Sequence, residues 1–355
     1  MHFVHKISLM IHTASPDDFL SGQGIPSYYR ALLENLCRQT IKEFELVYVD
    51  TFHESNRDRF GQYVAGLPFI TKHVPVHHEH RYWFDRGYTY ISAAKNTGII
   101  HADGELCVTC DDAEFFPDDL LERYWRHYKS GHLMLGMHKR MKSIKTHDGL
   151  PSFPITGDIY INDHRFNTIS ERLKYHTNGS WGFAGTSFPL VDAINLNGFN
   201  EKMDGCKSLE DCEFATRLQM LGRKFVQDKD GFVYILDHQS YSEMRPTNWE
   251  PTQGQDCQES PIPPIANPRK KIDNLIAVEN FGMYQCAVKL NRLKANRSAP
   301  NQDEMKIIRE ETLKYRGFDP LAPENSEKLA VWMGVPNFDI ASQRKTLRSS
   351  REWRW

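Results

Sequence analysis

The sequence lacks the features that mark membrane-spanning, secreted and nucleic-acid-binding proteins. No stretch approaches the roughly 20 apolar residues that a membrane-spanning helix needs. The amino-terminal segment MHFVHKISLMIHT lacks the long apolar region of a signal peptide. The formal net charge is −2, so no strong electrostatic field favours nucleic acid or an anionic membrane. We therefore expect a cytoplasmic globular protein that has no nucleic-acid partner.

Cysteine is scarce and irregularly spaced. The chain has 7 cysteines, an odd and scattered set that favours free thiols in a reducing compartment. Cys107 and Cys110 form a C-x-x-C pair, but residues three apart on a β-strand point to opposite faces of the sheet. A zinc or redox site at this pair is therefore the less favoured interpretation.

The first two thirds of the chain alternate between strand-like and helix-like segments. Expected strands cover residues 6–12, 44–50, 69–76, 105–110, 133–138 and 232–237, and expected helices cover 26–39, 89–102, 117–129 and 208–221. Residues 143–185 are polar and irregular, and we expect loops and an accessory sheet there. Such alternation predicts an α/β domain with a mostly parallel sheet.

The composition changes after about residue 241. The segment RPTNWEPTQGQDCQESPIPPIANP is rich in Pro, Gln and Asn and is typical of a linker. We therefore divide the chain into a domain over residues 1–245 and a linker with a mainly helical, irregular extension over 246–355. The last segment, SQRKTLRSSREWRW, is basic with two tryptophans; it is either a loosely packed terminus or a peripheral contact with a membrane or partner.

One short stretch, CVTCDDAEFFPDD, places five carboxylates within nine residues. Like charges this close repel each other unless a cation, protonation or solvent relieves them. Asp118 and Asp119 suit the positive start of the helix that follows. Asp111 and Asp112 instead end a strand, where parallel sheets bind ligands, and their oxygens suit Mn²⁺ or Mg²⁺. Glu114 is either an outer metal ligand or a turn residue.

A second acidic pair begins the expected helix SLEDCEFATRLQMLG. Ser208 and Asp211 have the spacing of a capping box, so Glu210 and Asp211 are good helix-start residues. A helix amino terminus also keeps a carboxylate ionised, as a general base requires. Both interpretations remain open from the spacing alone.

Four segments, taken in order, resemble family 2 glycosyltransferases, which have the nucleotide-sugar-dependent GT-A fold. They are KISLMIHT with the helix that ends LCRQT, FELVYVD, ISAAKNTGIIHADGELCVTCDDAEFFPDDLL, and GTSFPLVDAINLNGFNEKMDGCKSLEDCEFATRLQMLG. The resemblance spans about residues 5–240. It implies a GT-A-type, Rossmann-like domain with a donor half over about 1–140 and an acceptor half over about 141–245.

The resemblance implies roles for residues on the nucleotide side of the site. Asp50 corresponds to the aspartate that binds the base or ribose, and Thr13 lines the same pocket through its backbone. Lys95 stands at a basic position that meets a phosphate or holds Asp50. Asp111 lies near the ribose or a metal-bound water.

The resemblance also implies a metal site and a catalytic base. Asp112 ligates Mn²⁺ or Mg²⁺, and His238 serves the metal or the diphosphate. Asp211 is the general base and Glu210 orients the acceptor. Aromatic candidates for stacking on an acceptor sugar are Trp181, Phe183, Tyr241 and Trp249.

The implied activity is that of an inverting, hexosyltransferase-type glycosyltransferase. The implied partners are a UDP-, GDP- or dTDP-sugar donor and a saccharide or other hydroxyl acceptor. The alternatives are a retaining transferase, a nucleotidyltransferase and a non-catalytic sugar-binding module. The sequence departs from the family in its long first loop, in DTFHESN after the second strand, and in Asp-Asp-Ala-Glu where Asp-x-Asp is usual.

Overall fold

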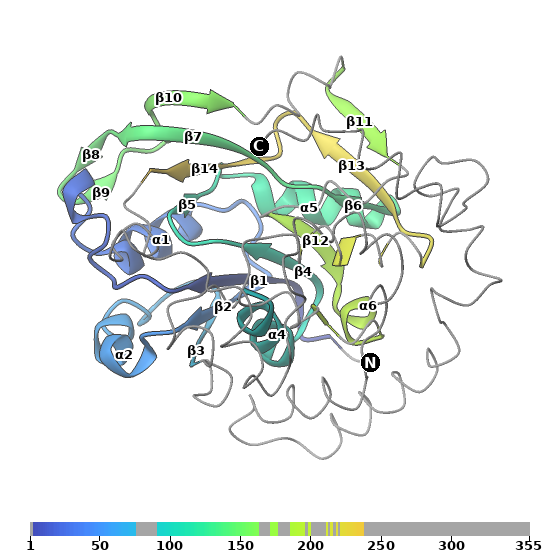
Figure 1. The fold of residues 1–355 in the computed structure, drawn as a ribbon, viewed down its shortest axis with the longest axis horizontal. Coiled ribbons are helices and arrows are strands. Elements are labelled where there is room, and N and C mark those ends of the chain that lie inside the picture. The colour runs from blue at the N-terminus through green and yellow to red at the C-terminus, as the bar shows by residue number, and fades with distance from the viewer. Residues whose placement is uncertain are drawn as a thin grey trace, which may run out of the picture.

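A five-stranded sheet, mostly parallel, forms the centre of the fold (Figure 1). The computed structural model describes residues 3–75, 91–162, 171–176, 185–195, 198–199, 211, 214–215, 218 and 221–237. Across the sheet the strands are β12 (Thr186–Pro189), β4 (Gly104–Cys110), β1 (His5–Thr13), β2 (Phe44–Asp50) and β3 (Ile70–Pro75). β12 runs antiparallel to β4 at one edge, and the other pairs are parallel. The predicted α/β class is confirmed.

The central strands are apolar because both faces of the sheet are covered, as is usual for parallel sheets. β2 is buried at every position, and five consecutive residues of β1 are buried. Helix α4 (Ile91–His101) packs against β1 and β2, α5 (Leu120–Lys129) against β1 and β4, and α2 (His53–Gly61) against β3. Near-continuous apolar runs such as FELVYV are therefore the sequence signal of this sheet.

Helix α1 (Tyr28–Cys37) starts at a cap built from two side chains. The Ser27 hydroxyl accepts a hydrogen bond from Arg30 N at 3.2 Å. Asp17, from the long first loop, accepts from Tyr29 N at 2.8 Å and from the Ser27 hydroxyl at 3.1 Å. A carboxylate at this end also complements the helix dipole. The first loop is thereby fixed to the start of α1.

Two smaller sheets lie beside the central one. One has the order β10 (Gly157–Asn162), β7 (Met137–Ile144), β14 (Phe232–Leu236), β5 (Glu114–Phe115); the other has the order β11 (Leu173–His176), β13 (Lys224–Asp228), β6 (His132–Met134). A hairpin joins β8 (Thr146–His147) to β9 (Leu150–Pro151). The expected single strand 133–138 is wrong, because the chain leaves β6 and enters β7 in a different sheet. The break falls at Gly136, whose Cα lies 3.4 Å from where a Cβ of Gly185 would stand.

Several other expectations have mixed outcomes. Helix α2 and strands β12 and β13 were not expected from the sequence, nor was the short helix α6 (Leu190–Asn195). Within the expected helix 208–221, residues 211, 214, 215 and 218 are described and helical, and Phe214 and Leu218 are buried as predicted. The extension over 246–355 lies outside the described residues. In the described part of the chain no helix has the length and apolar character needed to cross a membrane.

A polar cluster fixes the strands at the amino-terminal end of the central sheet. The buried Glu45 carboxylate accepts hydrogen bonds from the Ser8 hydroxyl at 2.5 Å and from Asp103 N at 2.6 Å. Lys72 Nζ lies 2.7 Å from the other Glu45 oxygen. Gly104 N donates to the Ser8 hydroxyl at 2.8 Å. These contacts join β1, β2, β3 and the start of β4 in one register.

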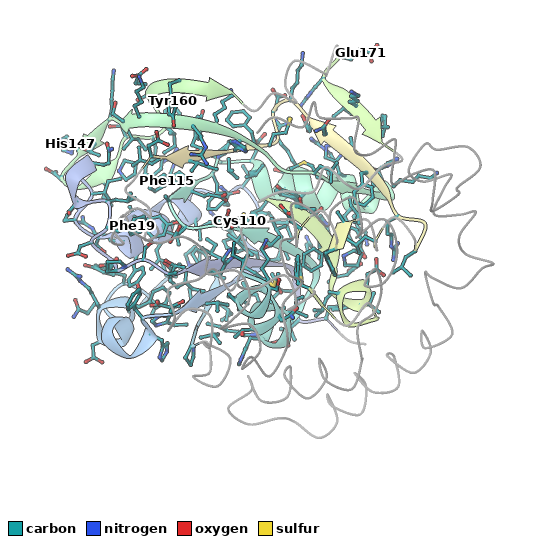
Figure 2. All side chains as sticks on the ribbon, viewed as in Figure 1. Phe19, Cys110, Phe115, His147, Tyr160 and Glu171 are labelled. Carbon is teal, nitrogen blue, oxygen red and sulfur yellow. The ribbon has the colours of Figure 1, made fainter. Side chains whose placement is uncertain are left out.

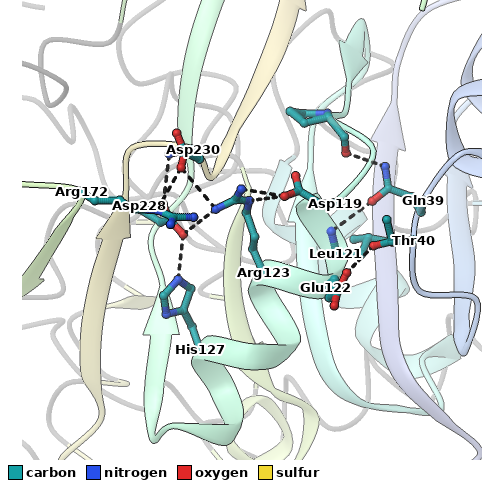
Figure 3. Close-up of polar contacts among 11 residues, drawn as sticks. Gln39, Thr40, Asp119, Leu121, Glu122, Arg123, His127, Arg172, Asp228 and Asp230 are labelled. Carbon is teal, nitrogen blue, oxygen red and sulfur yellow. Dashed lines mark hydrogen bonds and ion pairs between the residues drawn. The ribbon is translucent and has the colours of Figure 1, made fainter. Parts of the chain in front are cut away.

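A second buried network holds α5 to β13 (Figure 3). The Asp228 carboxylate is fully buried and lies 3.0 Å from His127 Nε2 and 3.2 Å from Arg123 Nη1. Burial acts to raise the pKa of Asp228, but the hydrogen bond from His127 and the positive charge of Arg123 lower it to about 2. Asp230, which is half exposed, lies 3.0 Å from Arg172 at the rim of the network.

We predict that Asp228→Asn lowers the free energy of unfolding by about 2 kcal/mol at neutral pH, because the folded-state pKa lies nearly two units below the ordinary value of 3.8. A carboxyl group whose pKa is lowered by folding stabilises the fold at pH values above its unfolded-state pKa. This stabilisation is lost as the pH falls through the folded-state pKa of about 2. The difference between wild type and variant should therefore vanish between about pH 4 and pH 2. Urea unfolding at several pH values measures it.

The matched control is Asp230→Asn, which removes an exposed charge from the same network. We expect it to change stability by less than about 0.5 kcal/mol, as exposed ion pairs usually do. A pH-independent difference between wild type and Asp228→Asn would contradict the assignment of an ionised, buried Asp228.

Candidate active site at the carboxyl ends of the central strands

The register of the central sheet brings three aspartates to one edge. Thr13, the last residue of β1, pairs with Asp50, the last residue of β2. On the other side of β1, Ile11 pairs with Cys110, so that Asp111 and Asp112 follow beside His12 and Thr13. Parallel strands end at the same edge, where α/β sheets bind ligands. The structure thus assembles the acids that the sequence placed at strand ends.

Asp112 is held by the hydroxyl of Thr13. Thr13 Oγ1 donates to Asp112 Oδ2 at 2.7 Å and accepts from Ser15 N at 3.0 Å. The Thr13 carbonyl accepts from both the backbone N and the hydroxyl of Thr51, at 3.1 and 2.8 Å. Thr13 therefore contributes its side chain to the acidic pair, while its carbonyl joins β1 to the segment after β2.

Asp111 has a different partner on β1. Its Oδ1 lies 3.0 Å from His12 Nε2, and its side chain is 48% exposed. Burial acts to raise the pKa of Asp111, but the hydrogen bond from His12 and the positive charges of His12, Lys95 and His138 lower it to about 2. Asp111 is therefore ionised at neutral pH, and its carboxylate oxygens can only accept hydrogen bonds.

Asp50 is fully buried at the end of β2. Its Oδ2 accepts from the Tyr29 hydroxyl at 2.8 Å and lies 2.9 Å from His73 Nε2, while its Oδ1 accepts from Phe52 N at 2.7 Å. The carboxylate in this arrangement faces other groups of the protein rather than solvent. Its contact with a base or ribose stays a prediction, and such a contact requires some of these donors to move.

The turn after Asp112 has an unusual backbone. Ala113 has φ of 58°, in the left-handed region that L-residues seldom adopt. Its carbonyl accepts from Leu236 N at 3.0 Å, and its side chain is fully buried. The Leu236–Ala113 hydrogen bond joins the end of β14 to the turn. Figure 2 shows Cys110 and Phe115, which bracket this turn, in the interior of the molecule.

Glu114 lies beneath the turn rather than beside a ligand. Its side chain is fully buried, and neither carboxyl oxygen makes a hydrogen bond of good geometry within the described residues. Burial, together with the negative charge of Asp111, raises the pKa of Glu114 well above the ordinary value. Burial therefore favours the protonated form of Glu114. Glu114 lies in β5, where it pairs with Ile235 of β14. This position favours a structural role over that of an outer metal ligand.

Helix α1 and the loop after it support this strand–turn–helix from behind. The Asn35 side chain exchanges two hydrogen bonds with the backbone of Phe116, at 2.7 and 2.9 Å. The Gln39 amide accepts from Leu121 N at 3.1 Å, near the start of α5 (Figure 3), and donates to Pro117 O at 2.8 Å. Both side chains satisfy backbone groups that lack partners at the end of a strand and the start of a helix.

The two aspartates that follow the turn are paired with arginines. Asp118 binds Arg38 at 2.7 and 3.1 Å, and Asp119 binds Arg123 one helical turn later, at 2.6 Å. Asp119 is the cap residue of α5 but makes no side-chain capping bond. Their predicted location at the helix start is correct, although arginine pairing, rather than capping, satisfies their charge.

Lys95 and Asn96 connect α4 to the second half of the chain. Lys95 is buried, with Nζ 5.2 Å from the ring centroid of Phe199. Asn96 binds the backbone of Phe199 in both directions, at 2.6 and 3.0 Å. The phosphate contact predicted for Lys95 remains a prediction. Asn96 was not singled out from the sequence, although a polar residue inside the apolar helix ISAAKNTGII is a usable signal.

Other predicted site residues are described only in part. Asp211 is half-buried and helical. Glu210, His238, Trp181, Phe183, Tyr241 and Trp249 lie outside the described residues. Within the described part of the chain, no group of three or more His, Cys, Asp or Glu side chains is arranged to hold a metal ion. Asp112, with carboxylate oxygens at the exposed edge, nevertheless has the donor chemistry that Mn²⁺ or Mg²⁺ requires.

Sequence reasoning missed the side chains that hold the acids. His12, Tyr29 and His73 each lie within 3.0 Å of a site carboxylate. His12 precedes Thr13 in β1 and His73 lies within an expected strand, so each had a weak signal as a polar residue in an apolar segment. Which acid each one meets depends on strand register, which the sequence alone does not determine.

Comparisons with known proteins identify the fold. No protein-family model matches the sequence, and no curated protein matches it significantly. The structure of GalNAc-T7 with UDP, GalNAc and Mn²⁺ is similar at a TM-score of 0.50 and 11% identity, over 87% of this chain and 55% of that one. A fragment of S. aureus TarS, residues 1–349 with UDP-GlcNAc, matches at a TM-score of 0.46 and 15% identity, over 98% and 93% of the two chains.

The longer S. aureus TarS structure matches at a TM-score of 0.42 and 14% identity, over 92% of this chain. This chain thus spans about half of the length of TarS and of GalNAc-T7, 46% and 55% respectively. The central sheet and the likeness to GalNAc-T7 define a fold of the GT-A glycosyltransferase type, as the sequence predicted. Membership of family 2 in particular stays a prediction.

We predict that Thr13→Val lowers the free energy of unfolding by about 1–2 kcal/mol, because Asp112 loses a hydroxyl donor of the kind that charged acceptors depend on. Valine has nearly the same shape, so packing is preserved. Thr13→Ser keeps the hydroxyl and should lose less than half as much. Urea unfolding compares the three proteins, and equal stability of wild type and Thr13→Val would show that the 2.7 Å contact is unimportant.

Proposed function

We propose that this protein is a glycosyltransferase that moves a sugar from a nucleoside-diphosphate donor to an acceptor hydroxyl. The observation that carries the proposal is the group of aspartates at the carboxyl edge of a parallel sheet of GT-A type: Asp111 and Asp112 after β4 and Asp50 after β2. GalNAc-T7 was solved with UDP and GalNAc, and the TarS fragment with UDP-GlcNAc. The GalNAc-T7 likeness supports a nucleotide-sugar donor for a chain of this fold.

The proposed donor site uses charges of both signs. Asp112 would hold Mn²⁺ or Mg²⁺, with His238 as a further ligand, and the bound cation would neutralise charge that develops on the diphosphate leaving group. The Mn²⁺ of the GalNAc-T7 structure supports such a cation. Lys95, whose charge acts on Asp111, would meet a phosphate. Asp50 and Thr13 would line the nucleoside pocket.

The proposed chemistry is a single displacement that inverts the anomeric carbon. The oxygen of the acceptor hydroxyl attacks the anomeric carbon, and the nucleoside diphosphate leaves. Asp211 takes the proton of that hydroxyl during the attack. Glu210 orients the acceptor, and Trp181 and Phe183 stack on it. The half-buried, helical Asp211 is consistent with this role. If the helix begins at Ser208, as the sequence predicts, its amino terminus would favour the ionised form that a general base needs.

We predict that nucleoside diphosphates bind in a metal-dependent manner. Isothermal titration with UDP, GDP and dTDP, with and without Mn²⁺, should show one preferred nucleotide whose affinity rises with the metal. Asp112→Ala should lower that affinity in Mn²⁺ by about 100-fold or more, since even outer-shell partners of a metal contribute 10–100-fold.

The matched control for this titration is Asp118→Ala, which removes an acid of the same run that is paired with Arg38. It should bind like wild type. Binding that needs no metal and is unchanged in Asp112→Ala would refute the metal assignment. Failure of wild type to bind any of the three nucleotides would refute the proposed function.

We predict that Asp211→Asn keeps donor binding but loses transfer. Removing a general base should lower kcat by about 10²–10⁴-fold while the Kd for the nucleoside diphosphate stays within about twofold. Transfer assays and titration measure the two quantities. Retained transfer would place the base elsewhere, and NMR of the product anomer distinguishes inversion from the retaining alternative.

A further inference from the structure

His12 lies beside the acidic pair, and the function proposed above gives it no part. It occupies the next-to-last position of β1, and the β1–β4 register places it next to Asp111. Its Nε2 lies 3.0 Å from Asp111 Oδ1. The His12 side chain is 12% exposed and that of Asp111 is 48% exposed. The histidine thus stands on the inner side of a carboxylate whose outer side reaches solvent.

The chemistry of the pair fixes which group donates. An ionised carboxylate only accepts, so the hydrogen lies on His12 Nε2. The other ring nitrogen, Nδ1, is buried and has no hydrogen-bond partner within the described residues. The ring therefore makes one directed contact from a rigid strand. That contact determines the orientation of the Asp111 carboxylate.

The neighbouring acids are held in different ways. Asp50 is buried and its oxygens face donors of the protein. Asp112 Oδ2 accepts from Thr13. For Asp111 the described residues supply one side-chain partner, His12, to Oδ1. Asp111 thus combines a side-chain partner on a strand with a half-exposed carboxylate.

The strand geometry also separates the two adjacent acids. His12 and Thr13 are consecutive in β1, so their side chains point to opposite faces of the sheet. Asp111 contacts His12, and Asp112 contacts Thr13. Each acid therefore has its own partner on β1, His12 for Asp111 and Thr13 for Asp112.

We propose that His12 is a positioning residue that holds Asp111 so that its outer oxygen accepts hydrogen bonds from the ribose hydroxyls of the donor, leaving the cation to Asp112. The inference rests on the proposed function and deepens it, because the sequence left Asp111 between the ribose and a metal-bound water. The two neighbouring hydroxyls of a ribose can each donate a hydrogen bond, and an ionised carboxylate only accepts. An oriented carboxylate therefore suits them as a partner.

The test compares His12→Leu with His12→Gln by isothermal titration, using whichever of UDP and GDP, which both carry vicinal ribose hydroxyls, wild type binds better. Leucine fills similar space without a donor, whereas the glutamine amide can donate from a position close to that of Nε2. We expect His12→Leu to weaken binding about tenfold, with and without Mn²⁺, and His12→Gln to stay within about threefold of wild type. In transfer assays KM for the donor should rise while kcat stays within about twofold.

A double-mutant cycle with Asp111→Asn tests whether His12 acts through Asp111. In the Asp111→Asn background, we expect His12→Leu to change nucleotide affinity by less than about twofold. Full additivity, unchanged affinity in His12→Leu, or a loss confined to the Mn²⁺-loaded protein would each overturn the proposal. Equal loss in the leucine and glutamine variants would overturn it as well, because it would indicate a structural role. If wild type binds no nucleotide, the proposed function itself fails, which is a different result from any of these.

Discussion

The parallel pairing of β1 with β2 and β4 is the constraint on which the site depends. The pairing aligns Thr13 with Asp50 on one side and carries His12 and Thr13 alongside Asp111 and Asp112 on the other. Asp111 and Asp112 thereby find hydrogen-bond partners on β1, whereas the partners of Asp50 come from α1, β3 and the residues after β2. Several carboxylates crowded at one sheet edge would otherwise repel each other strongly in a partly dry environment.

The structure relieves this repulsion by several physical means within a few residues. Asp50 is buried among donors from Tyr29 and His73. Asp111 keeps its charge because a histidine and other basic groups lower its pKa to about 2. Burial raises the pKa of Glu114 well above the ordinary value and so disfavours a third charge beside Asp111 and Asp112. The acidic run therefore has protein partners or burial at most of its members, whether or not the cation proposed for Asp112 is bound.

The sequence predicted the elements that depend on local residue patterns better than the contacts between residues far apart in the chain. FELVYVD predicted β2 with its observed bounds, because a continuous apolar run of strand length has few other stable states. Helix α2 was missed because HESNRDRFG has almost no apolar face. The break between β6 and β7 was missed because the two strands join different sheets, and their partners β13 and β14 lie about 90 residues further along the chain. Asp111 and Asp112 were found as acids at a strand end, whereas their partners depended on register.

That register is fixed at the far end of the same strands. A Cβ on Gly104 would lie 2.4 Å from Ser8 N, so β4 can approach β1 this closely only with glycine there. The Ser8 hydroxyl receives Gly104 N and donates to the buried Glu45, which also binds Lys72. Ser8 lies four residues before His12 and Gly104 lies seven residues before Asp111, which is roughly 13–23 Å of strand. A slip of one residue would bring Thr13 beside Asp111 and turn His12 away from it. The amino-terminal cluster therefore contributes to the chemistry of the site without touching it.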